Sequence, residues 1–228
     1  MNLRTTLAAI LTIATAPLQA TTYTLEPKHT QGVVSWSHLG FSNPTAQFSG
    51  VAGTLQYDPA DPAAASVSVT IPIARLATGV PDLDDYFREK TFFDLAAFPN
   101  ATFRSTKIER GGTPGSLRVT GELTLRGVTK AVTLDAVLNK IGINPRNQLP
   151  TIGFAATTTL NRSDFGLGKF VPQVSDAVAI RITAEAAEAK AYAEQLRKEA
   201  EEEARDAKTA ASNGAVPAQP PANAPPKH

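Results

Sequence analysis

Residues 117–138 read LRVTGELTLRGVTKAVTLDAVL, two runs of alternating apolar and polar side chains joined by a short Arg126-Gly127 connection. The apolar residues share one parity within each run: Leu117, Val119, Leu123 and Leu125, then Val132, Leu134, Ala136 and Leu138. Because successive strand residues point to opposite faces of a sheet, each run has one apolar face. The stretch therefore predicts an antiparallel hairpin with a wet outer face and an apolar inner face.

The same kind of run recurs along the chain, separated by Pro, Gly and Asp turns. We expect strands near residues 23–26, 32–38, 46–57, 66–76, 101–109, 117–125, 128–138, 153–160 and 178–184. Eight or nine strands in one domain suit a closed barrel or a sandwich. A sheet that curls on itself protects its edges and can enclose an apolar pocket.

The segment 81–93, PDLDDYFREKTFF, breaks the two-residue period. Leu83, Tyr86 and Phe87 fall at helical spacing, which predicts one short helix that closes an end of the barrel. Three acidic residues stand at the start of the segment: Asp82, Asp84 and Asp85. We interpret them as stabilising the positive N-terminus of the helix and not as a cation site, because no loop of EF-hand type surrounds them.

The two ends of the chain differ from this domain. Residues 1–20 carry Arg4, an apolar core and then small residues, which predicts a secretory signal peptide cleaved after Ala20. Residues 188–210 are rich in Ala and charged residues and predict a solvated helix, with Glu194–Lys198 and Glu201–Arg205 pairs four residues apart. Residues 211–228, rich in Pro and Ala, predict a disordered tail.

Composition narrows the class of protein. The formal net charge is +1, which gives no basic excess for binding nucleic acid. The chain has no cysteine, so neither disulfides nor cysteine–zinc sites can support the fold. After signal removal no second long apolar segment remains, and a bacterial periplasm, or secretion, fits best.

Few residues suggest catalysis. His29 and His38 lie nine positions apart around one predicted strand, so a shared site would require a bulge. His38 shares the parity of Val34 and Trp36, which places it inside the barrel or at its mouth, as a structural, ligand-contacting or catalytic group. We interpret Arg162, in the turn Asn161–Gly166, as a structural residue, and a contact between its side chain and a ligand headgroup is the open alternative.

The chain resembles the YceI family of exported, lipocalin-like polyisoprenoid-binding proteins over about residues 22–187. The matching pieces are YTLEP at 23–27 with His29, HLGF at 38–41, GTLQYDP at 53–59, FFDLAAFPNATFRS at 92–105, GELTLRGVTKAVTLD at 121–135 and TTTLNRSDFGL at 157–167. The family often has Arg before the His of its His-Leu-Gly motif and a basic residue before the next Phe. Here Ser37 and Ala46-Gln47 stand at those positions, so a headgroup preference does not carry over.

The resemblance implies an all-β, eight-stranded antiparallel barrel over residues 21–187, with the short helix near one end. Its lumen would hold an isoprenoid chain, an isoprenoid quinone or another amphipathic lipid for transport or storage, with no cofactor and no metal. The residues expected to line it are Val34, Trp36, His38, Val69, Ile71, Leu83, Tyr86, Phe87, Phe103, Leu123, Leu125, Val132, Leu134 and Phe154.

Two other functions stay open from the sequence alone. An enzyme acting on a lipid or quinone in the same cavity would need a polar pair, for which His38 is the candidate. A structural or adapter protein would act through its C-terminal helix. The partner expected is an amphipathic lipid, and a homodimer is also left open.

Overall fold

The computed structural model describes residues 20–212. The predicted signal peptide, apart from Ala20, and the predicted tail, apart from residues 211 and 212, lie outside the described residues. The strands are β1 (Thr21–Leu25), β2 (Gln31–Ser35), β3 (Thr45–Phe48), β4 (Ala52–Tyr57), β5 (Ser66–Pro72), β6 (Leu76–Ala77), β7 (Asn100–Arg110), β8 (Ser116–Leu125), β9 (Val128–Ile143), β10 (Pro150–Asn161) and β11 (Ala177–Glu188). The helices are α1 (Pro81–Arg88) and α2 (Ala189–Ser212), with 3₁₀ turns η1 (Pro62–Ala64), η2 (Ile73–Arg75) and η3 (Arg162–Phe165).

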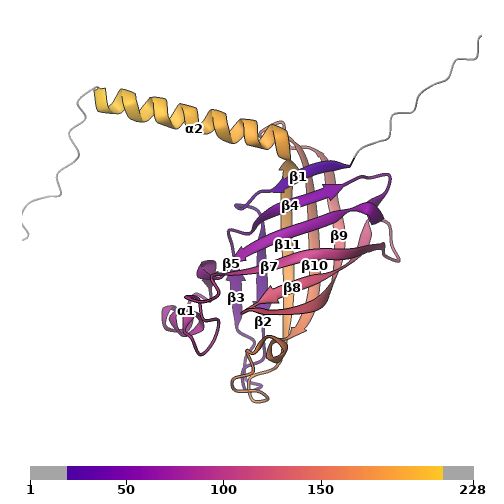
Figure 1. Ribbon diagram of the computed structural model, residues 1–228, viewed down its shortest axis with the longest axis vertical. Coiled ribbons are helices and arrows are strands. Elements are labelled where there is room, and N and C mark those ends of the chain that lie inside the picture. Colours follow the sequence, from indigo (N-terminus) through magenta and orange to yellow (C-terminus); the bar gives the residue numbers. More distant parts are fainter. Residues whose placement is uncertain (1–19, 213–228) are drawn as a thin grey trace, which may run out of the picture.

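These strands form a closed antiparallel barrel with eight strand positions (Figure 1). β1 and β2 both pair with β11, at residues 186–188 and 179–183 of that strand, so they are two halves of one interrupted strand. β3 and β4 form the next position, and β5 and β6 the third. β7 to β11 complete the ring, and the β1–β11 pairing closes it.

The predicted eight-stranded barrel is confirmed. The described residues form eleven strands because three of the eight strand positions are interrupted. The predicted strands 23–26 and 32–38 are the two halves of one position. The predicted strand 32–38 runs too far: β2 ends at Ser35, and the next residues leave the ladder because Ser37 N–H donates to Ser175 Oγ (2.9 Å) and His38 bridges to Ser42 and Val174.

The hairpin of residues 117–138 is formed by β8 and β9. Its register sets Val119 opposite Leu134 and Gly121 opposite Val132, and these residues face the barrel interior. Both turn residues have positive φ, 50° at Arg126 and 74° at Gly127, the geometry that lets a two-residue turn follow the twist of its strands.

α1 and the loop after it lie beside the barrel, at the left of Figure 1. β6 pairs with β3 alone, so at this end of the barrel the ladder between the third strand position and β7 ends at the Pro72–Asn100 pair. Phe87 packs against Phe92 (4.5 Å between ring centres) and Phe93 (6.2 Å).

Asp84 accepts hydrogen bonds from Thr78 N–H (2.7 Å) and Oγ1 (2.6 Å), and Asp85 pairs with Arg88 (2.9 Å). Within residues 20–212 no acidic side chain caps the first N–H groups of α1, so the helix-start role of these residues stays a prediction.

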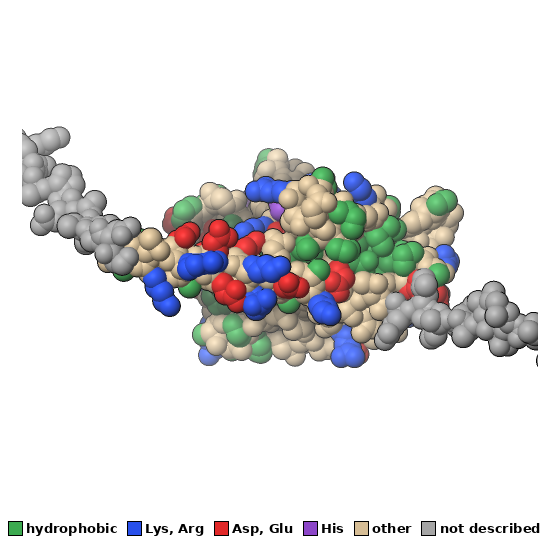
Figure 2. Space-filling model, turned by 90° about the horizontal axis from the view of Figure 1, so that it is seen from above, with side chains coloured by type: hydrophobic (Ala, Val, Ile, Leu, Met, Phe, Trp, Pro, Cys, Tyr) green, Lys and Arg blue, Asp and Glu red, His purple; other side chains and the backbone are tan. Residues whose placement is uncertain are grey.

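α2 leaves the barrel directly after β11, and Figure 2 shows acidic and basic side chains interspersed along it. It ends two residues later than predicted, at Ser212, because Ala210 and Ala211 are good helix formers. Glu194 pairs with Lys198 (2.9 Å) as predicted, whereas Glu201 pairs with Arg197 (2.7 Å). Among the described residues, no helix combines the length and apolar character that crossing a membrane requires.

Gly121 makes room for an aromatic ring inside the barrel. A Cβ at this position would lie 2.4 Å from Phe103 Cζ and 2.5 Å from the Arg104 carbonyl oxygen. We expect Gly121→Ala to lower the free energy of unfolding by about 1–3 kcal/mol, measured by urea denaturation. Gly112→Ala, where a Cβ meets nothing within 4 Å, is the control and should cost less than about 0.5 kcal/mol. Equal losses in the two variants would contradict this account.

Candidate functional site

The barrel encloses a cavity of about 610 Å³ whose walls are almost entirely apolar. Side chains from all eight strand positions, from α1 and from η3 line it. Pockets for small molecules usually measure about 300–1,000 Å³, so this cavity has the size of a ligand site. The alternation of the strands produces it, because every second residue points inward.

All fourteen residues predicted to line a lumen do line this cavity. The strands contribute Val34, Val69, Ile71, Phe103, Leu123, Leu125, Val132, Leu134 and Phe154, α1 contributes Leu83, Tyr86 and Phe87, and Trp36 and His38 follow β2. Their contact with a ligand is still a prediction. Trp36 packs edge-on against Phe87 (5.8 Å between ring centres), so the single tryptophan lies beside α1.

The lining residues with exposed side chains are His38, Lys169 and Phe170, so the cavity opens between two loops, residues 36–44 and 166–176. Leu39 N–H donates to the Gln173 carbonyl (3.1 Å), and His38 bridges to Val174, which holds the loops together. Phe170 both lines the cavity and is 57% exposed, so it lies at the rim. His38 lies at this rim as well, whereas His29 lies in the β1–β2 turn beside Glu26. The two histidines therefore do not share a site.

Some of the polar groups that line the cavity lie near this rim, whereas Gln31, Tyr57 and Thr158 line it from the strands. The Tyr86 hydroxyl is buried and has no hydrogen-bond partner among the described residues. Lys169 Nζ lies 5.0 Å from the centre of the Tyr86 ring and 5.1 Å from that of Phe170. Sequence reasoning missed Lys169 because it lies in a loop, where no strand parity shows that a side chain faces the lumen.

Arg162 holds the rim together. Its guanidinium is buried and donates to three backbone carbonyls: those of Ser175 (2.9 Å), Val174 (3.0 Å) and Leu167. Burial lowers the pKa of this guanidinium from its usual value, and the charge of Asp176 opposes that shift. Asp176 also accepts from Ser163 Oγ (2.6 Å), and this hydrogen bond lowers the pKa of Asp176. The structural interpretation of Arg162 therefore accounts for its contacts.

Arg162→Lys tests this role, because a lysine keeps the charge but cannot reach three diverging carbonyls as a planar guanidinium does. We expect the free energy of unfolding to fall by about 2–3 kcal/mol, measured by urea denaturation, since buried acceptors lose their donors. Arg118→Lys, at an exposed site beside Asp135, is the matched control and should be nearly neutral. A stable Arg162→Lys protein would contradict the role.

Comparison with known proteins supports the fold and gives the family. A UPF0312 protein of Pseudomonas putida (strain F1) is 36% identical over 166 residues, covering 70% of this chain and 85% of the relative. The crystal structure of Burkholderia cenocepacia BcnA matches with a TM-score of 0.61 and 26% identity, covering 69% of this chain and 96% of that one. A polyisoprenoid binding domain from Saccharophagus degradans shares the fold at 14% identity and a TM-score of 0.54, covering 75% and 99%. The YceI-like domain model matches residues 23–186. The chain therefore belongs to the YceI family.

Proposed function

We propose that this protein binds an amphipathic lipid with an isoprenoid or similar chain, an isoprenoid quinone included, and carries or stores it in the periplasm. The observation that carries the proposal is the cavity of about 610 Å³ with almost entirely apolar walls inside a closed barrel. The Saccharophagus degradans domain of the same fold is described as polyisoprenoid binding, which adds support. Periplasmic location rests on the signal peptide expected from the sequence.

Burial of the chain would supply the binding energy. Each methylene removed from water contributes about 0.8 kcal/mol, so affinity should rise about fourfold per added methylene until the cavity is full. Ordering the chain and losing its translational freedom offset part of this gain.

Filling the cavity tests the proposal. Ala156 lines the cavity, whereas its neighbour Ala155 is exposed on the outer face of β10. We expect Ala156→Phe to weaken binding of a long polyprenyl compound at least tenfold, followed by Trp36 fluorescence. The matched control Ala155→Phe should bind like the wild type. Equal binding by both variants, or no binding by the wild type, would count against the proposal.

The position of the polar groups supplies an orientation for the lipid. Tyr86, whose hydroxyl has no partner among the described residues, and Lys169 lie near the rim, with Lys169 Nζ 5.0 Å from the centre of the Tyr86 ring, while the strands present mostly apolar side chains. A buried hydroxyl without a partner destabilises the free protein, and a headgroup oxygen that accepts its hydrogen bond would remove this cost. In the proposed complex the polar end therefore lies beside Tyr86 and Lys169, with the chain toward β8 and β9.

Tyr86→Phe separates the polar contact from the apolar ones. We expect five- to tenfold weaker binding of a polyprenyl phosphate or quinone, because one hydrogen bond to the headgroup is lost. Binding of a hydrocarbon without a headgroup, such as squalene, should stay unchanged, and the free variant should unfold at a slightly higher temperature. Calorimetric titration and thermal unfolding measure these effects, and an equal loss for both ligands would refute the orientation.

A further inference from the structure

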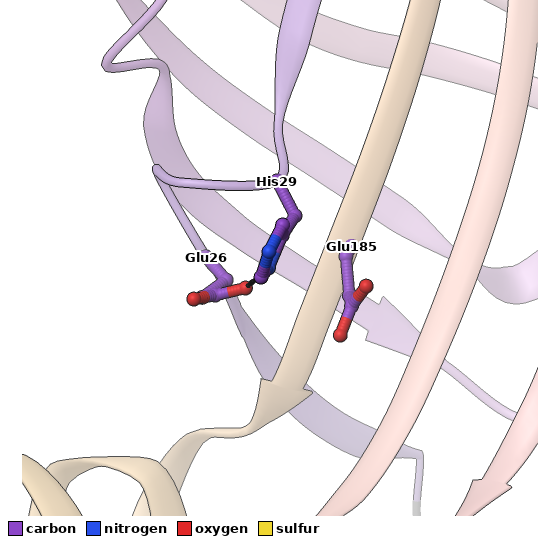
Figure 3. A group of neighbouring side chains, drawn as sticks. All are labelled: Glu26, His29 and Glu185. Carbon is purple, nitrogen blue, oxygen red and sulfur yellow. Dashed lines mark hydrogen bonds and ion pairs between the residues drawn. The ribbon is translucent and has the colours of Figure 1, made fainter. Parts of the chain in front are cut away.

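We propose that Glu26, His29 and Glu185 form a binding site for a divalent transition-metal ion of the zinc class, outside the lipid cavity. Figure 3 shows the His29 ring between the two carboxylates. One ligand atom from each residue lies within 4.8 Å of the other two. Glu26 and His29 lie in the break between β1 and β2, and Glu185 comes from β11.

The backbone already holds these residues in place. Glu26 N–H donates to the Glu185 carbonyl (2.8 Å), and His29 N–H donates to the Glu26 carbonyl (3.2 Å). Thr30, whose side chain is buried, donates to the Glu185 carbonyl (3.1 Å) and accepts from Glu185 N–H (3.2 Å). The turn is thus fixed to β11, so an ion would need small side-chain movements and no rearrangement of the main chain.

The side chains are also oriented by second contacts. Asn144 Nδ2 donates to Glu185 Oε1 (3.1 Å), which leaves Oε2 for an ion. His29 Nδ1 hydrogen-bonds to Glu26 Oε2. The bond from Asn144, which lies outside the ligand set, is of the kind that fixes the orientation of a ligating carboxylate and commonly strengthens metal binding.

The donor set selects the class of ion. One imidazole nitrogen and two carboxylate oxygens suit Zn²⁺ and other first-row divalent ions, whereas Ca²⁺ prefers six to eight oxygen ligands. Of the three residues, Glu185 also lines a surface pocket of about 210 Å³, together with Asn144 and Lys140 among others. Sequence reasoning missed the site because Glu185 is far from His29 in the chain, and strand pairing alone brings it close.

Such an ion would link the β1–β2 turn to β11 beside the point where the barrel closes. β1 contributes three residue pairs to that closure: Tyr23 with Glu188, Thr24 with Ala187 and Leu25 with Ala186. Binding to the folded chain alone should therefore raise its unfolding temperature. This inference is independent of what the lipid cavity holds.

The test uses the full chain without a histidine tag. Calorimetric titration with ZnCl₂ should show one ion per chain with micromolar affinity, and saturating Zn²⁺ should raise the unfolding temperature by several degrees. His29→Ala and Glu185→Gln should each weaken binding at least tenfold, and circular dichroism would check that both fold. His38→Ala, at the cavity rim, is the matched control and should bind like the wild type.

Two results would overturn the inference. One is wild-type Zn²⁺ binding no tighter than millimolar. The other is tight binding that survives His29→Ala. Should either variant fail to fold, Co²⁺ titration of the wild type decides instead, because His and carboxylate ligands give an absorption spectrum distinct from that of hydrated Co²⁺. A spectrum that stays that of hydrated Co²⁺ refutes the site.

Discussion

The pairing of β1 with β11 is the constraint on which the rest of the structure depends. It joins residues 23–25 to residues 186–188 and turns an open sheet into a barrel. An open sheet would expose two edges and its apolar inner face to water. Closure satisfies the edges and gives the inward side chains a shared interior, which here is wide enough to leave a cavity. The cavity, its rim and the cluster at His29 all follow from that ring.

Much of the fold could be predicted from the sequence because strand parity is a local property. The parity of residues 117–138 correctly identified the inner face of β8 and β9, and motifs shared with a known family added the eight-stranded barrel. Local patterns could not show that β1 and β2 are one interrupted strand, because that depends on their common partner β11. They also could not place Lys169 or Glu185, which reach their neighbours through tertiary contacts.

The cavity divides its chemistry between wall and rim. The strands supply mostly apolar side chains at regular spacing, whereas α1 and the loop after η3 supply Tyr86 and Lys169. Arg162 also lies near the rim, but each of its three nitrogens donates a hydrogen bond to a backbone carbonyl. A positive charge near a cavity is therefore not in itself a ligand contact, and the unpartnered Tyr86 hydroxyl is the more informative atom.

The long sequence separation between β1 and its partner β11 also determines when the barrel can close during synthesis. β1 is made early, but its partner residues 186–188 are made only after the other strands of the ring. Pairings between distant segments form slowly, because the loop between them must first be closed. The closed barrel therefore cannot form until the chain is nearly complete. A chain that stops before residue 186 would lack this pairing and would leave its apolar inner face accessible to proteases and to other chains.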